Sequence, residues 1–143
     1  MDKKSLILAT LASAGDSKYT PVQIQKIFFL IDRQLGKKIG GPFFNFKPYH
    51  YGPFDKDLYN QLQELTKEGL VQTNLNPLNS LTKFSLTETG RLKGQKELRR
   101  ISSKERDFIV TLNAYVRSMT FSQLVASIYK AYPEMKKNSI FTD

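Results

Sequence analysis

The chain has 143 residues, a length that accommodates one core of modest size, and a formal net charge of +9 at pH 7. It contains no cysteine and a single histidine, which excludes disulfides, thiolate metal sites and His/Cys metal clusters. No segment approaches the roughly 20 apolar residues of a membrane-spanning helix, and the positive charge indicates a polyanionic partner. We expect a cytoplasmic protein with no membrane attachment and no cofactor.

The amino-terminal stretch has basic residues followed by apolar ones, an order that superficially resembles a signal peptide. The apolar run from Leu6 to Leu11 is short, and Asp2 lies within the charged part. A buried first helix from about Lys3 to Ser13, ending at Gly15, explains the pattern better.

The second expected helix has a strong start signal. Thr20 is a good N-cap, and Pro21 suits the first helical turn. The segment from Ile27 to Ile31 is apolar almost all round, which is typical of a central, buried helix. Gly36 is expected to end this helix. The aromatic run from Phe43 to Phe46 is then either an extended strand or a loop packed on the core.

Prolines and aromatic residues are concentrated in the segment KPYHYGPF, from Lys47 to Phe54. One hypothesis is a rigid recognition loop before the third helix, in which Lys47 and His50 contact a phosphate or a partner. The alternative is a structural elbow whose rings fill the space between the second and third helices. The pattern favours the elbow for residues 51–53 and leaves the role of His50 open.

The next stretch, from Asp55 to Arg91, indicates a helix, a hairpin and a new helix. Leucines recur at helical spacing after Asp55, which can cap the helix, and Gly69 can end it. Leu70-Val71 and Phe84-Ser85-Leu86 predict two strands, and the polar residues 76–80 between them supply turn chemistry. Thr87 is placed to cap the following helix.

This order is similar to the third helix and wing of a winged helix-turn-helix domain. Such a domain is most often used to grip a duplex, although winged helices also serve as protein-docking modules. We therefore predict a mainly α fold with a small β-hairpin, consisting of a winged helix-turn-helix-like core plus C-terminal helices.

The C-terminal part is expected to be helical throughout. Helices are predicted from about Thr89 to Arg100, from a capping-box pattern at Ser102, and from Thr120 or Ser122 to a point before Pro133. The pattern gives the middle helix an apolar side, formed by Phe108, Ile109, Leu112, Tyr115 and Val116. We expect residues 1–143 to form a single domain, with a core in residues 1–90 and a helical extension, residues 91–143, packed on it.

Charge along the chain does not follow the fold prediction. Residues 91–106 carry seven cationic side chains against two carboxylates, although lysine-rich helix faces are usually just solvated. Residues 55–69, which would form the recognition helix, carry two lysines against four carboxylates. Because DNA phosphates repel carboxylates, this balance argues against DNA recognition by that helix. Fold and charge therefore point to different surfaces.

Two short motifs resemble those of the Panacea antitoxin-like, phage-associated domain family. Ile24-Gln25-Lys26-Ile27-Phe28-Phe29 is similar to the helix "LQKLxY" of that family, and Tyr51-Gly52-Pro53 is similar to its "YGP" turn some twenty-five residues later. The resemblance covers roughly residues 5–70. It implies a helical domain of prokaryotic or phage origin, often an antitoxin or adaptor, with no catalytic residues to carry over.

Catalytic motifs are missing from the sequence. No glycine loop has phosphate-binding spacing, and no Gly-x-Ser-x-Gly elbow is present. Asp55 and Asp57 lack the third carboxylate that a magnesium nuclease site needs. We therefore expect a protein that is not an enzyme.

Two classes of function fit these patterns. The first is a DNA-binding transcription regulator, possible as a homodimer, that contacts double-stranded DNA through phosphates and base edges. The second is a protein-protein interaction module, an antitoxin or adaptor that binds an acidic partner through the same basic face. The candidate contact residues are Lys47, His50, Lys56, Asn60, Gln61, Lys83, Arg91, Lys93, Lys96, Arg99 and Arg100.

Overall fold

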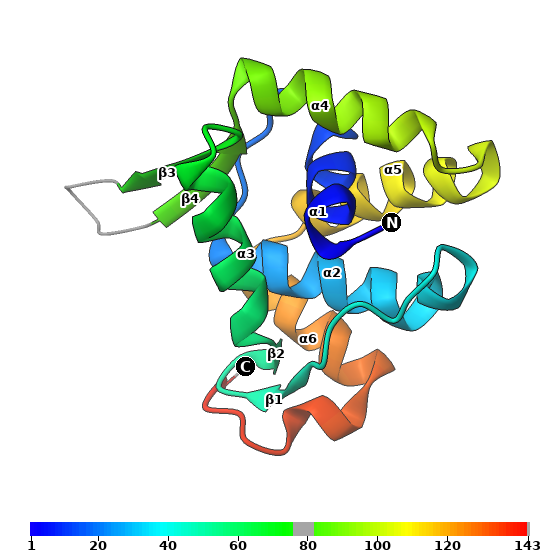
Figure 1. Cartoon of the computed structure of the whole chain (residues 1–143). Coiled ribbons are helices and arrows are strands. Elements are labelled where there is room, and N and C mark those ends of the chain that lie inside the picture. Colours follow the sequence, from blue (N-terminus) through cyan, green and yellow to red (C-terminus); the bar gives the residue numbers. More distant parts are fainter. Residues whose placement is uncertain (76–81, 143) are drawn as a thin grey trace.

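The computed structural model describes residues 1–75 and 82–142 (Figure 1). The fold is mainly helical, with two small antiparallel hairpins, as the sequence predicts. The helices are α1 (Lys3–Ala12), α2 (Pro21–Gln34), α3 (Lys56–Lys67), α4 (Glu88–Arg99), α5 (Ser103–Ser118) and α6 (Phe121–Ala131). The strands are β1 (Lys47–Tyr49), β2 (Gly52–Phe54), β3 (Val71–Leu75) and β4 (Thr82–Leu86). Two 3-10 turns cover Gly36–Lys38 and Pro133–Lys136.

Helix boundaries follow the predicted capping residues. Thr20 forms a reciprocal capping box with Gln23 at the start of α2, and Thr87 accepts the Gly90 N–H at the start of α4. Gly69 follows α3 with a φ of 76°, the left-handed conformation that favours glycine. The prediction for α5 was partly wrong, because that helix begins at the expected place but the side chain of Ser102 makes no capping hydrogen bond.

The predicted hairpin is confirmed, with β3 and β4 paired from Val71 opposite Leu86 to Leu75 opposite Thr82. The turn residues predicted in the segment 76–80 lie outside the described residues. On its other side β4 pairs with Tyr19, which lies between α1 and α2. The backbone groups of Tyr19 and Phe84 exchange two hydrogen bonds of 2.8 Å. The hairpin is thereby tied to the helical core.

The connection between α2 and α3 contains a second hairpin, which the sequence reading as a loop or an elbow missed. Strands β1 and β2 pair antiparallel, with Pro48 opposite Pro53. Before them, Phe43–Phe46 is a loop packed on the core, the second of the two predicted alternatives. Since this long connection separates α2 from α3, the two helices are not joined by the three- or four-residue turn of a standard helix-turn-helix.

Among the described residues the core is one cluster built from α1, α2, α3, α5 and α6, and α4 packs on it through the partly buried Leu98. Helix α1 crosses the middle of the molecule between α4 and α2 (Figure 1), and Leu6, Ile7 and Leu11 on it are fully buried. On α5 the predicted apolar side divides, because Ile109 is buried whereas Tyr115 is 53% exposed. Within the described part of the chain, no helix combines the length and apolar character needed to cross a membrane.

Candidate nucleic-acid interface

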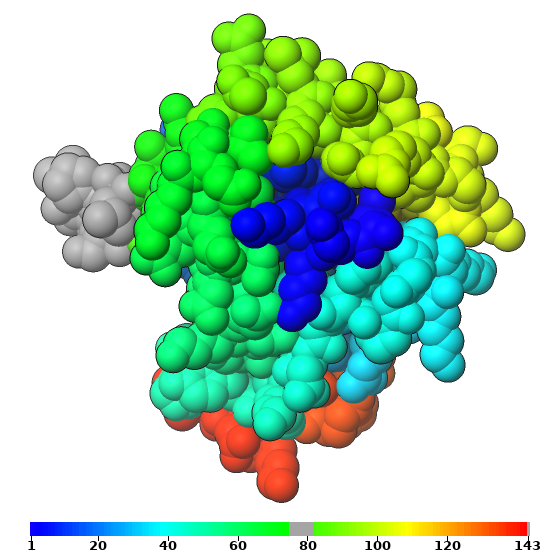
Figure 2. Space-filling model, viewed as in Figure 1, coloured from blue at the N-terminus to red at the C-terminus, as the bar shows by residue number. Residues whose placement is uncertain are grey.

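The carboxylates of α3 lie on the side of the helix that faces α1. Lys3 pairs with Asp57, and Lys4 contacts Glu68 at 2.9 Å and Glu64 at 3.8 Å. The Lys3 ammonium is the main cause of a lowered pKa for Asp57. In Figure 2 the amino-terminal residues (dark blue) reach the surface directly beside α3 (green). The two α1 lysines therefore offset the negative charge of this helix.

A different stripe of α3 points to solvent. Lys56, Asn60, Gln63 and Lys67 recur at intervals of four, three and four residues, so they lie along one helix face. All four side chains are exposed, and the stripe contains no carboxylate. We call these four residues the α3 stripe. The net charge of the whole helix does not show that its lysines and amides lie on a different face from its acids.

The β3–β4 hairpin lies beside α3. The hydroxyls of Thr66 and Thr73 are 3.1 Å apart, and the ring of Tyr59 stacks on that of Phe84 with the centroids 6.2 Å apart. In Figure 1 the hairpin projects outward beside α3. Because side chains alternate along a strand, the exposed Lys83 lies on the opposite face of the hairpin from Phe84. Lys83 therefore does not share the surface that packs on α3.

Two predicted residues meet at the start of α3. Lys47 and Lys56 line the same shallow groove, together with Tyr49. His50 is exposed and stacks on Tyr49 at 4.1 Å, and its carbonyl accepts the Ile140 N–H at 2.9 Å. Lys47 thus extends the α3 stripe, whereas His50 borders the C-terminal segment.

Gln61 lies away from the stripe, on the carboxylate side of α3. Its side-chain amide is half-buried and directed at Asp57, with the nitrogen and oxygen atoms 3.5 Å apart. Asn60, the neighbouring candidate, is exposed on the stripe. Both amides contribute to the lowered pKa of Asp57, but they differ in exposure, although the sequence treats them alike.

The remaining candidates belong to α4, whose inner side packs on α1 through glycines. A Cβ atom on Gly94 would lie 2.4 Å from the Leu8 carbonyl oxygen, so the opposite side of α4 faces solvent. Among the basic candidates, Arg91 pairs with Asp16 and Arg100 with Glu97 at 3.0 Å. The exposed basic residues of this face are Lys93, Lys96, Arg99 and Arg100. In Figures 1 and 2, α4 runs along the upper edge of the molecule, while α3 descends beside the hairpin. The basic candidates therefore form two separate surfaces.

The two motifs that resemble the Panacea family contact each other. Gln25 receives the Asp55 N–H at 2.9 Å and donates to the Asp55 carbonyl at 3.0 Å, which holds the start of α3 against α2. Lys26 is 3% exposed, and its ammonium nitrogen lies 3.5 Å from the position that a Cβ atom on Gly52 would occupy. Burial lowers the pKa of Lys26 to about 7. The sequence offered only the motif itself as a signal for this contact.

Comparison with known proteins gives no assignment for these surfaces. No protein-family model matches the chain, and no curated protein matches it. The resemblance to the Panacea family therefore stays a prediction.

Proposed function

We propose that this protein is a non-catalytic regulator that binds double-stranded DNA through the α3 stripe, with the β3–β4 hairpin alongside. The observation that carries this proposal is the separation of charge on α3. Lys3 and Lys4 pair with Asp57, Glu64 and Glu68 on one side of the helix, so the α3 stripe on another side carries only lysines and amides. Phosphate contacts dominate affinity for a duplex, and this surface suits them.

The order of residues along the stripe also fits a groove. Lys56 and Lys67 are eleven residues apart, or about 16 Å along the helix axis. Asn60 and Gln63 lie between them. The major groove is roughly 12 Å wide, so a helix in it brings the outer lysines near phosphates and the inner amides near base edges. The net charge of +9 supports attraction to any duplex.

The test compares two charge reversals of equal size. Lys56→Glu with Lys67→Glu changes the stripe, and Lys93→Glu with Lys96→Glu changes α4 by the same total charge. We expect the stripe variant to weaken binding to a random duplex by roughly tenfold or more and to reduce the salt slope by about 2, while the α4 variant loses much less. Equal losses would mean that only overall charge matters, and a larger loss on α4 would move the interface there.

A second candidate function is favoured by one observation on α4. Leu92 is 61% exposed and lines a shallow depression together with Lys93, Lys96 and Arg100. An apolar side chain among cations contributes little to binding a phosphate backbone, but it suits an acidic, amphipathic helix of a protein partner. In this reading the protein is an antitoxin or adaptor.

A charge-neutral substitution separates the two candidates. Leu92→Ser should weaken binding of a synthetic acidic amphipathic peptide severalfold, because apolar contact area is lost, and should leave duplex binding unchanged. Thr89→Ser, on the same face, serves as the control. If the peptide binds neither protein more tightly than a scrambled acidic peptide does, the second candidate fails.

A further inference from the structure

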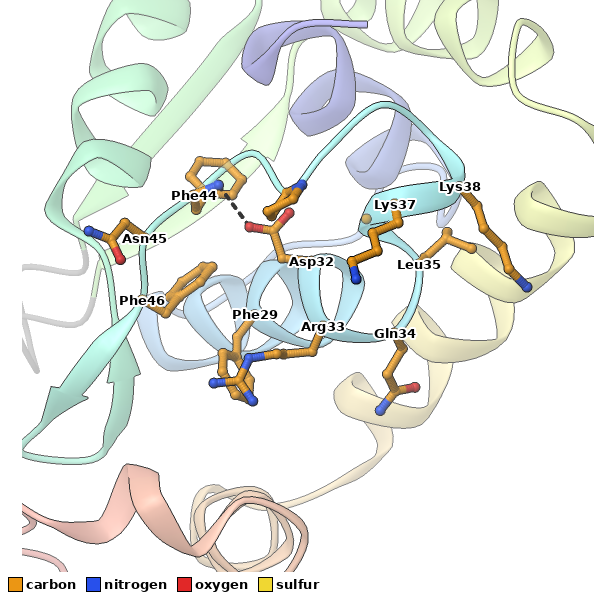
Figure 3. Close-up of a pocket in the computed structure, with 12 residues that line it drawn as sticks. Phe29, Asp32, Arg33, Gln34, Leu35, Lys37, Lys38, Phe44, Asn45 and Phe46 are labelled. Carbon is orange, nitrogen blue, oxygen red and sulfur yellow. Dashed lines mark hydrogen bonds between the residues drawn. The ribbon is translucent and has the colours of Figure 1, made fainter.

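A cavity of about 630 Å³ lies beside the C-terminal end of α2 (Figure 3). Its walls come from the last turns of α2, the 3-10 turn that follows, and the loop before β1. The volume is typical of sites for small molecules, which range from about 300 to 1,000 Å³. The lining includes the side chains of Phe29, Asp32, Arg33, Lys37, Phe44 and Phe46.

The loop wall is held in place by carboxylates. Asp32 accepts the Phe43 N–H at 2.9 Å and the Phe44 N–H at 2.7 Å, and Asp55 accepts the Asn45 N–H at 2.8 Å. Partial burial raises the pKa of Asp32, while its two backbone hydrogen bonds act in the opposite direction. Three consecutive backbone amides are thus bonded, so the cavity is formed without a ligand.

Aromatic rings line one side of the cavity. Phe46 packs edge to face on Phe29, with centroids 5.6 Å apart, and lies the same distance from Phe44. The guanidinium of Arg33 lies over the ring of Phe29 at 5.0 Å. Aromatic rings with a stacked guanidinium are a surface on which planar rings pack favourably.

Cations exceed anions around the opening. Arg33 pairs with Glu134 at 3.3 Å, whereas no carboxylate of residues 1–75 or 82–142 lies within ion-pair distance of Lys37. In Figure 3, Lys37 points across the cavity, whereas Lys38 belongs to the lining at the end farthest from the aromatic rings. Cations near a helix C-terminus also interact favourably with the helix dipole. The helix dipole explains why cations lie at this end of α2, but it does not explain why aromatic rings lie beside them.

From the geometry we infer that this cavity binds a small planar aromatic anion, with a purine mononucleotide as the nearest common chemistry. The ring packs on the half-buried rings of Phe44 and Phe46, which the buried Phe29 supports, and the phosphate meets the ammonium of Lys37 near Arg33. Asp32 acts as a positioning residue, because it fixes the loop that carries two of the rings. This site is independent of the surface proposed for DNA.

The first experiment titrates the full chain with AMP, adenosine and ribose 5-phosphate separately, by calorimetry at physiological salt. We expect saturable binding of AMP that is at least about fivefold tighter than that of either fragment, since each fragment lacks one half of the recognition. If ribose 5-phosphate bound as tightly as AMP, the aromatic wall would contribute nothing to binding. Exposed lysines alone would then explain the affinity, and the inference would be wrong. Failure of AMP to saturate at millimolar concentration would overturn the inference.

The second experiment uses two adjacent lysines as matched variants. Lys37→Gln should weaken AMP binding by about tenfold, the loss expected for one charge-assisted hydrogen bond, and leave adenosine binding unchanged. Lys38→Gln removes the same charge and should change AMP affinity less than about twofold. Equal losses in the two variants would contradict the inference. Phe46→Leu should weaken AMP and adenosine together, and thermal melts establish that each variant is folded.

Discussion

Helices α3 and α4 both present cations to solvent, but they are held to the core in different ways. Helix α4 lies against the backbone of Leu70 at Gly90 and against α1 at Gly94, so that its own backbone comes close to the backbone of both neighbours. Helix α3 is held by buried leucines, by the hydrogen bonds of Gln25 to Asp55, and by ion pairs from the two α1 lysines.

The net charge of a helix therefore differs from the charge of the surface that the helix presents to solvent. Glycines occupy the inner side of α4, so its charged side chains gather on the outer side. On α3 the acids are turned toward Lys3 and Lys4, so a helix that is acidic overall presents a stripe without acids. The proposed division of roles between these helices rests on that contrast.

The largest expected effect comes from breaking the contact that anchors α4. In Gly90→Ala the new Cβ would lie 1.8 Å from the carbonyl oxygen of Leu70, a backbone atom that cannot rotate away. We expect a loss of about 3 kcal/mol or more in the free energy of unfolding, measured by chemical denaturation. Thr89→Ala, one position earlier and exposed, is the control and should change stability by less than about 1 kcal/mol. A Gly90 variant as stable as this control would show that α4 does not lie so close.

A second prediction concerns Lys26, which is buried next to the hairpin that leads into α3. Its pKa of about 7 in the folded chain lies below the ordinary 10.5, so between these values the unfolded chain binds a proton that the folded chain does not. Stability should therefore rise with pH across this range, and the full cost of the buried charge applies below it.

Replacing this lysine tests the sign directly. Lys26→Met keeps a similar volume and should stabilise the protein by about 2–4 kcal/mol at pH 6, with the gain shrinking as the pH approaches 10. The measurement is a denaturation midpoint at each pH, for wild type and variant. Lys130→Met, at an exposed site on α6, is the control and should shift stability little. A gain that is constant with pH would show that titration of Lys26 is not its cause.

The smallest expected effect separates two neighbouring amides on α3. Asn60→Ala should alter sequence preference among duplexes by about 1–3 kcal/mol at one base pair, because its exposed amide lies on the stripe. Gln61→Ala should leave preference unchanged, since that amide is directed at Asp57. Competition binding with a randomised duplex library measures both. Identical profiles for the two variants would argue against groove recognition by the stripe.

The helices and the β3–β4 hairpin could be predicted from the sequence alone. Their signals are local: Thr20, Asp55 and Thr87 accept hydrogen bonds from amides two or three residues ahead, and Gly69 takes a conformation that other residues avoid. A neighbour within one helical turn is fixed by chain connectivity, so its position can be inferred from spacing alone. The fold class was therefore predictable.

Which residues come together in a site depends on the tertiary structure and could not be predicted from the sequence. The pairing of Tyr19 with β4, the lysines of α1 beside α3, and the carboxylate of Asp32 under a later loop join residues distant in the sequence. No local spacing encodes these contacts, because they depend on how the helices pack. Packing turned the acids of α3 toward α1 and left a separate stripe of lysines and amides, a separation that composition and net charge could not reveal.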